Sequence, residues 1–254
     1  MKTVSFSAIK GGVGKSSLTI LMAKFISQVI KLKTLVIDLD FQNSTSFHFA
    51  VKGEQNIADA LFHNQIRKNI IVLDDYLHIV QSSLRLTKMG TISPNSLKML
   101  LQDIKSEYDW CIIDTPPNYN NIVLNGLFAA DLIVTPVTME CFFDRKTAVF
   151  FREQLEMEYP ELLKKWKLLF TKVRKPKSEN SNIIRYENSY LNTFHNFLNT
   201  KIPETKLIPG IIDTNSPLHQ KTWEKVLVTI TELYDEIDLC LNTARRDTVN
   251  EKIG

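Results

Sequence analysis

A cluster of glycines, lysines and serines between residues 9 and 17 carries the clearest chemistry in the sequence. The segment reads Ile-Lys-Gly-Gly-Val-Gly-Lys-Ser-Ser, and Gly11, Gly12 and Gly14 leave its backbone free to turn several N–H groups toward an anion. Lys15 supplies a cation for the β- and γ-phosphates of a nucleotide, and Ser16 supplies a hydroxyl ligand for Mg²⁺. The segment therefore predicts a loop that binds nucleotide phosphates.

Aspartates at the ends of two apolar runs form a second group of candidate residues. Asp38 and Asp40 follow the run 34–37, and Asp114 follows the run 110–113. A carboxylate that ends a buried strand beside a phosphate loop is typical of a Walker B strand, which holds Mg²⁺ through a water.

These residues require a sheet whose strands end at a common edge. Apolar and β-branched runs predict strands, and apolar residues spaced by three and four predict the helices between them. The expected strands are 3–6, 34–37, 77–80, 110–113, 131–135, 166–171 and 206–209, and the expected helices begin near residues 18, 57, 93, 120, 142, 183 and 223. The alternation predicts an α/β fold with a single doubly wound, mostly parallel sheet and helices on both faces. We expect one domain spanning residues 1–254.

The composition limits the possible classes of protein. The net charge is only +3, from 31 basic and 28 acidic residues, so contact with a polyanion would have to come from a local cluster. Cys111, Cys141 and Cys240 are widely separated and form no Cys-x-x-Cys pair, which favours reduced thiols in a cytosolic protein over zinc or disulfides. Cys111 lies in an apolar run and is expected in the core. No apolar run approaches 18 residues, so we expect neither export nor a membrane span.

The phosphate loop departs from the common G-x-x-x-x-G-K-[ST] pattern at its start. Ile9 stands where the first glycine is usual, and a second lysine, Lys10, follows it to give K-G-G-V-G-K-S. This deviant Walker A loop resembles that of the ParA/Soj/MinD family of P-loop ATPases. The D-x-D segment at 38–40 and the sequence Asp114-Thr115-Pro116-Pro117, which resembles the switch II of the family, follow in the same order. The resemblance covers nearly the whole chain and is closest to short ParA/Soj-type proteins.

The resemblance implies a role for each of these residues. The ATP-binding residues implied by it are Gly11, Gly12, Val13, Gly14, Lys15, Ser16 and Ser17 in the loop, with Lys172, Pro209 and Ile211 near the adenine. Ser16, Asp38 and Asp114 would serve the Mg²⁺ site. Asp40 would orient the attacking water, and Lys10 would reach across a face-to-face dimer to the phosphates of the partner subunit.

The sequence also departs from the family pattern at three places. Phe41 replaces a proline after the D-x-D segment, and Gly210 and Asp213 stand where the family carries arginines that contact DNA. The strongest basic cluster lies elsewhere, in the loop after strand 166–171, where Arg174, Lys175 and Lys177 are candidates for binding DNA. A solvated, solubilising loop is an equally good interpretation of this cluster.

The implied function is that of a slow, partner-stimulated ATPase with ATP and Mg²⁺ as cofactors. It would form a homodimer with ATP, bind nonspecific DNA in the cytoplasm at the nucleoid, and partition a plasmid or chromosome with a ParB-type protein. Three alternatives share the loop: a MinD-like membrane-cycling ATPase, a small-molecule ligase such as dethiobiotin synthetase, and a nonhydrolysing nucleotide-gated scaffold. The polar, mixed-charge segment 242–254 disfavours the first, and no contact with a membrane is expected.

Overall fold

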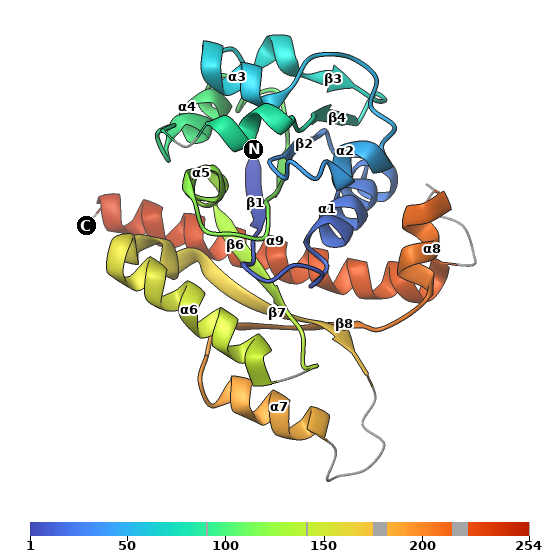
Figure 1. Cartoon of the computed structure of the whole chain (residues 1–254), viewed down its shortest axis with the longest axis vertical. Helices are drawn as coiled ribbons and strands as arrows, with labels where there is room; N and C mark the ends of the chain where they lie inside the picture. Colours follow the sequence, from blue (N-terminus) through green and yellow to red (C-terminus); the bar gives the residue numbers. More distant parts are fainter. Residues whose placement is uncertain (90, 141, 175–181, 215–222, 254) are drawn as a thin grey trace.

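The computed structural model describes residues 1–89, 91–140, 142–174, 182–214 and 223–253, without the side chains of 142, 143, 214 and 245–253. Its framework is an eight-stranded sheet in the order β3-β4-β2-β5-β1-β6-β7-β8 (Figure 1). The neighbouring strands run parallel except for β3, which pairs antiparallel with β4. The strands are β1 (Lys2–Phe6), β2 (Thr34–Asp38), β3 (Ile71–Val72), β4 (Leu77–Val80), β5 (Trp110–Asp114), β6 (Leu132–Val137), β7 (Trp166–Val173) and β8 (Phe197–Pro203).

Helices cover both faces of the sheet, which confirms the doubly wound fold. The helices are α1 (Lys15–Lys24), α2 (Ser44–His48), α3 (Ile57–His63), α4 (Ser96–Gln102), α5 (Asn121–Ala129), α6 (Phe142–Glu158), α7 (Asn182–Leu191), α8 (Leu207–Thr214) and α9 (Glu224–Ile253). Trp110 and Ile112 of β5 share a core cluster with residues of α1, α8 and α9. Cys111 and Ile113 point the other way, into a cluster with α3, α4 and α5, and α6 and α7 cover the same face beyond α5. Alternate residues of the strand therefore supply two separate cores.

Side-chain caps fix the starts of two helices where the sequence predicts them. The side-chain oxygen of Asn56 accepts a hydrogen bond from the backbone N–H of Asp59 at the start of α3. Asn120 accepts one from the N–H of Val123 at the start of α5. Both contacts satisfy N–H groups that a helix leaves without an internal partner. The expected core position of Cys111 is also confirmed, since its side chain is fully buried and burial raises the pKa of the thiol.

The last third of the sheet differs from the sequence prediction. The strand expected at 206–209 is the start of helix α8. The final strand is β8, whose first residue, Phe197, was assigned to the end of the preceding helix and whose other residues were assigned to no element. From Leu198 to Pro203 buried and exposed residues alternate, which is the pattern of a strand and was masked by the aromatic residues before it. Helix α7 accordingly ends at Leu191 rather than running to Phe197.

The long C-terminal helix uses its apolar stripe to build the core. Val226, Ile230, Leu233, Ile237 and Leu241 of α9 are all buried against β1, β5 and α1, as the spacing predicts. Across the described ranges of the chain, no helix combines the length and the apolar character needed to cross a membrane.

Three strands bring the candidate residues to one edge of the sheet. Phe6, the last residue of β1, pairs with Asp114 of β5, and Asp114 pairs on its other side with Asp38 of β2. Helix α5 packs closely over the end of β5 because residue 126 is glycine; a Cβ there would lie 2.9 Å from Cγ2 of Thr115. The phosphate loop and the carboxylates therefore lie at the carboxyl ends of adjacent parallel strands, where ligands bind in such sheets.

Candidate functional site

The segment between β1 and α1 forms an open cradle for an anion. Gly12 and Gly14 have φ angles of 74° and 103°, which lie in the left-handed region that favours glycine. Apart from the glycine itself and its two neighbours in the chain, no atom of the described residues lies within 4 Å of the position that a Cβ would take at either residue, so the space above the loop is clear. Gly14 begins α1 without a side-chain cap, which leaves the N–H groups of the first turn available to a ligand.

Lys15 lies at the base of this cradle. Only 6% of the residue is exposed, and its Nζ donates a 3.5 Å hydrogen bond to the backbone oxygen of Lys10. Burial lowers the pKa of Lys15, while the nearby Asp114 and Asp40 carboxylates act in the opposite direction. A phosphate group would supply the negative charge that this buried ammonium needs.

The carboxylates of Asp38 and Asp114 lie side by side behind the loop. Burial, reinforced by the charge of Asp114, raises the pKa of Asp38 to about 7, and burial raises that of Asp114 to about 6. Asp114 Oδ2 accepts a 2.7 Å hydrogen bond from Thr45 Oγ1, and a hydrogen bond from Ser16 lowers the pKa of the same carboxyl. Oδ1 of Asp114 is buried and has no hydrogen-bond partner among the residues that the structure describes. An unsatisfied carboxylate oxygen beside the Ser16 hydroxyl fits the water shell of a Mg²⁺ ion.

Asp38 holds the segment that follows it. Its Oδ1 accepts a 3.0 Å hydrogen bond from the N–H of Asp40, and its Oδ2 accepts bonds of 2.9 Å and 2.6 Å from the N–H and hydroxyl of Ser46. Asp40 in turn accepts a 2.9 Å bond from the N–H of Gln42, and burial raises the pKa of Asp40. The two aspartates therefore differ in environment: Asp38 is fully buried and bound to its own loop, whereas Asp40 lies near Lys15.

A cavity of about 630 Å³ opens beside the phosphate loop. Its lining includes Val13, Gly14 and Ser17 of the loop and α1, together with Lys172 and Pro209, the two residues predicted to lie near the base. Lys172 has a φ angle of 53°, an unusual conformation for a residue other than glycine. The volume is within the range of small-molecule sites, so the cavity can hold a nucleoside.

Ile211, the third residue expected near the adenine, does not line this cavity. It is fully buried in the core cluster that contains β1 and α9. Residues 207–214 form a helix instead of a strand and turn, and this helix directs Ile211 toward the core.

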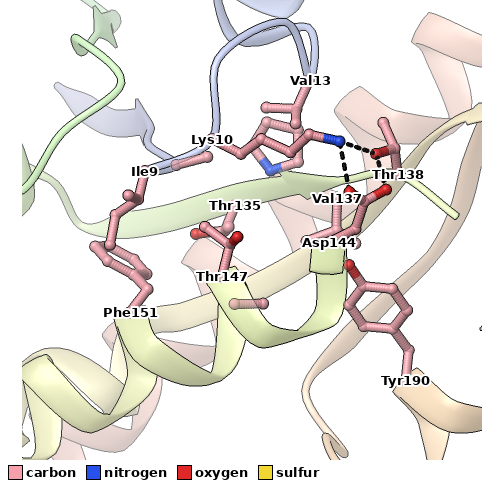
Figure 2. Close-up of a pocket in the computed structure, with 13 residues that line it drawn as sticks. Ile9, Lys10, Val13, Thr135, Val137, Thr138, Asp144, Thr147, Phe151 and Tyr190 are labelled. Atoms are coloured by element: carbon pink, nitrogen blue, oxygen red, sulfur yellow. Dashed lines mark hydrogen bonds and ion pairs between the residues drawn. The ribbon is translucent and has the colours of Figure 1, made fainter. Parts of the chain in front are cut away.

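The side chain of Lys10 points toward the first turn of α6. Figure 2 shows its Nζ beside the side chains of Thr138 and Asp144. The distance from Lys10 Nζ to Asp144 Oδ1 is 2.5 Å, and Thr138 Oγ1 and Glu140 Oε2 lie 3.3 Å and 3.7 Å from the same nitrogen. In the single chain Lys10 is therefore bound within its own subunit.

The candidate DNA-binding cluster is only partly described. Arg174 is exposed and its guanidinium donates two hydrogen bonds to the carboxylate of Glu204, one of them 2.8 Å long from Nη2 to Oε1. Lys175 and Lys177 lie outside the described residues. The ion pair reduces the net positive charge that Arg174 alone offers to a phosphate.

Comparison with known proteins identifies the family. Residues 1–148, more than half of the chain, match the family model described as an AAA domain. The ParA family protein of the Chlamydia psittaci virulence plasmid is 33% identical over 152 residues, covering 56% of this chain and 59% of the relative. The chain belongs to the ParA/Soj family of P-loop ATPases. The part of the chain that aligns with such ParA relatives spans about three fifths of their length.

Solved structures extend the likeness over almost the whole ParA-type fold. A plasmid partition protein from Borrelia burgdorferi bound to AMPPNP has a TM-score of 0.75 and 26% identity, covering 92% of this chain and 98% of its own. Cobyrinic acid a,c-diamide synthase from Mycobacterium smegmatis, with bound ADP and magnesium, has a TM-score of 0.68 and 20% identity, covering 84% and 90%. The second likeness shows the fold alone. The fold therefore does not separate a partition ATPase from a small-molecule synthase, and the site has to do so.

Four polar residues of the site were missed by the sequence reasoning. Thr45 and Ser46 bind the carboxylates of Asp114 and Asp38. Thr138 and Asp144 bind Lys10. The run Asn43-Ser44-Thr45-Ser46 directly after the D-x-D segment could have indicated the first pair, because short hydroxyl side chains are common partners of buried carboxylates. Asp144 lies 134 residues from Lys10, and no local pattern links them.

Proposed function

We propose that this chain is an ATP-dependent dimerisation switch that binds nonspecific DNA and partitions a plasmid or chromosome. The observation that carries the proposal is the opposite placement of two lysines on one phosphate loop. Lys15 is buried beside the Mg²⁺-type carboxylates, whereas Lys10 reaches the rim with 33% of its side chain exposed. One subunit thus provides a cation for its own nucleotide and a second cation that can act on another.

The chain's own residues account for binding and hydrolysis. The loop N–H groups from Gly11 to Ser17 and the Lys15 ammonium would hold the triphosphate, and the cavity with Lys172 and Pro209 would hold the adenosine. Ser16 and Asp114, with Asp38 behind them, would hold Mg²⁺, which neutralises phosphate charge when bound. Asp40 lies near Lys15 and would orient the attacking water.

Lys10 would complete the charge around the phosphates from the partner subunit. One lysine and one loop neutralise only part of the charge that develops during phosphoryl transfer, and a cation supplied in trans makes hydrolysis depend on assembly. Stimulation by a ParB-type partner, and location at the nucleoid in the cytoplasm, belong to this proposal.

Lys10→Ala should bind ATP with nearly parental affinity and remain a monomer, because the missing contact is made only between subunits. Size-exclusion chromatography with light scattering, in ATP and Mg²⁺, measures this directly. Lys105→Ala, at an exposed lysine after α4, is the matched control and should dimerise normally. An unchanged shift from monomer to dimer in Lys10→Ala would remove the trans-lysine mechanism.

DNA binding should depend on ATP, since pairing doubles any basic surface of the subunit. Sedimentation of the ATP-bound protein with and without nonspecific duplex DNA, at two salt concentrations, tests the proposed function. We expect cosedimentation with ATP that weakens as salt rises, by about 0.9 log units of affinity per log unit of salt for each phosphate contact. ATP-bound protein that sediments in the same way with and without DNA would contradict the proposal.

Replacing Arg174, Lys175 and Lys177 together by alanine should weaken binding to unrelated duplexes alike and flatten its salt dependence, while ATP-driven dimerisation survives. The matched control replaces three exposed lysines on other segments, Lys52, Lys68 and Lys105. Fluorescence anisotropy over a salt series measures how the DNA affinity of each variant depends on salt. If the variant without Arg174, Lys175 and Lys177 binds DNA with parental affinity, the cluster is a solvated loop. The DNA-binding surface would then lie near Arg145, Lys146, Lys221 or Lys225.

A further inference from the structure

A buried aspartate on α6 holds the lysine that is proposed to act between subunits. The side chain of Asp144 is 2% exposed, and its Oδ1 lies 2.5 Å from Lys10 Nζ, in the range of a strong charge-assisted hydrogen bond. Figure 2 shows Asp144 projecting from the first turns of α6 toward the tip of the Lys10 side chain. An ammonium held at this short contact directs one of its three N–H donors at Asp144, so the contact competes with a phosphate on a second subunit.

The carboxylate of Asp144 does not depend on Lys10 alone. Its Oδ2 accepts a 2.6 Å hydrogen bond from Thr138 Oγ1 and a 3.1 Å bond from the N–H of Glu140. If Lys10 leaves, Asp144 keeps these two donors, which reduces the penalty for a buried charge without its cation. The site can therefore exist in two states, with Lys10 bound in its own subunit or released.

We propose that Asp144 is a positioning residue that holds Lys10 within its own subunit and thereby opposes dimerisation until ATP is bound. The inference rests on the proposed function of Lys10 in trans. It adds a regulatory element to that function: phosphates of a second subunit must displace Asp144 from Lys10. A chain without this contact dimerises at a lower protein concentration.

The effect enters twice, because a symmetric dimer uses two Lys10 side chains. A binding-competent fraction f in each subunit multiplies the apparent dimerisation constant by f². If the contact with Asp144 keeps about nine tenths of the lysines bound in their own subunit, dimerisation is weakened by about 100-fold.

Asp144→Asn removes the negative charge and keeps an oxygen that accepts from Thr138 and Glu140. Sedimentation equilibrium with a nonhydrolysable ATP analogue should show its dimer dissociation constant lowered by about 10- to 100-fold. In a Lys10→Ala background the same substitution should leave the protein a monomer, which checks that the tighter dimer still forms through Lys10. Glu140→Gln is the matched control, because Glu140 is farther from Lys10, at 3.7 Å, and half exposed, so its effect should be about twofold or less.

A second measurement tests the contact in the monomer without nucleotide. The acylation rate of the Lys10 amine, followed by mass spectrometry, should rise several-fold in Asp144→Asn, while the rate at exposed Lys105 stays constant. Asp144→Ser serves if the asparagine variant proves unstable in thermal denaturation, because its shorter side chain cannot reach Lys10.

The two measurements separate the two proposals. Unchanged acylation of Lys10, or an unchanged dimer constant in a chain that does dimerise, overturns the role of Asp144. If neither parent nor variant dimerises with the analogue, the proposed function of Lys10 in trans fails, and the regulatory role of Asp144 fails with it. Faster acylation together with tighter, Lys10-dependent dimerisation supports both.

Discussion

Lys15→Ala should abolish ATP binding, lowering the affinity by at least about 100-fold. Lys15 is the buried cation at the base of the loop, and its replacement leaves the phosphates without a side-chain cation from their own subunit. Isothermal titration calorimetry with Mg²⁺ and ATP measures the loss. Removal of a buried ammonium should not destabilise the fold, so thermal denaturation of the variant should resemble that of the parent.

Lys10→Ala is the matched control for this prediction, because both variants remove one ammonium from the same loop. Lys10 faces Asp144 at the rim, whereas Lys15 lies beneath the loop, so only Lys15→Ala should lose binding in the monomer. Near-parental affinity in Lys15→Ala would refute the assignment of the phosphate site.

Asp40→Ala should stop hydrolysis and leave an ATP-bound dimer, with the turnover rate reduced by about 100- to 10,000-fold. Lys10, Lys15 and Ser16 still hold the triphosphate in this variant, but the water loses the carboxylate that orients it. Phosphate release over time, measured beside light scattering of the same sample, separates the two effects. Asp40→Asn, which keeps an acceptor for the N–H of Gln42, distinguishes loss of the carboxylate from loss of the turn.

Hydrolysis at the parental rate in Asp40→Ala would place the water-orienting group elsewhere, with Asp38 the next candidate. The hydrogen bonds from Ser46 and Asp40 already occupy both oxygens of Asp38, which makes it the weaker candidate. If the parent chain itself dimerises with ATP but releases no phosphate with DNA or any partner, the nonhydrolysing scaffold becomes the better description.

The sequence predicted those parts of the structure that depend on neighbouring residues. The loop around Gly14, the strands ending at Asp38 and Asp114, and the starts of helices α3 and α5 each combine a short pattern with a local physical reason. A glycine-rich turn between a strand and a helix has few alternatives, and a capping asparagine acts within three residues. These elements position the phosphate loop and the carboxylates.

The remainder depends on contacts between distant segments. Strand β8 was missed because Phe194 and Phe197 continue a helical spacing, although Phe197 stacks on Phe170 of β7 with ring centroids 4.3 Å apart. The pairing of Lys10 with Asp144 joins β1's loop to α6 and is visible only in the fold. Sequence reasoning assigned Lys10 to the partner subunit, and the structure adds a competing site for it in its own.

The central claim is that ATP converts a monomer into a dimer through Lys10. Sedimentation velocity of the parent chain and Lys10→Ala, each with Mg²⁺ and either ADP or a nonhydrolysable ATP analogue, tests this claim most directly. The account predicts a dimer only for the parent with the analogue, and monomers in the other three samples. A parent chain that sediments as a monomer with both nucleotides, or as a dimer with both, would contradict it.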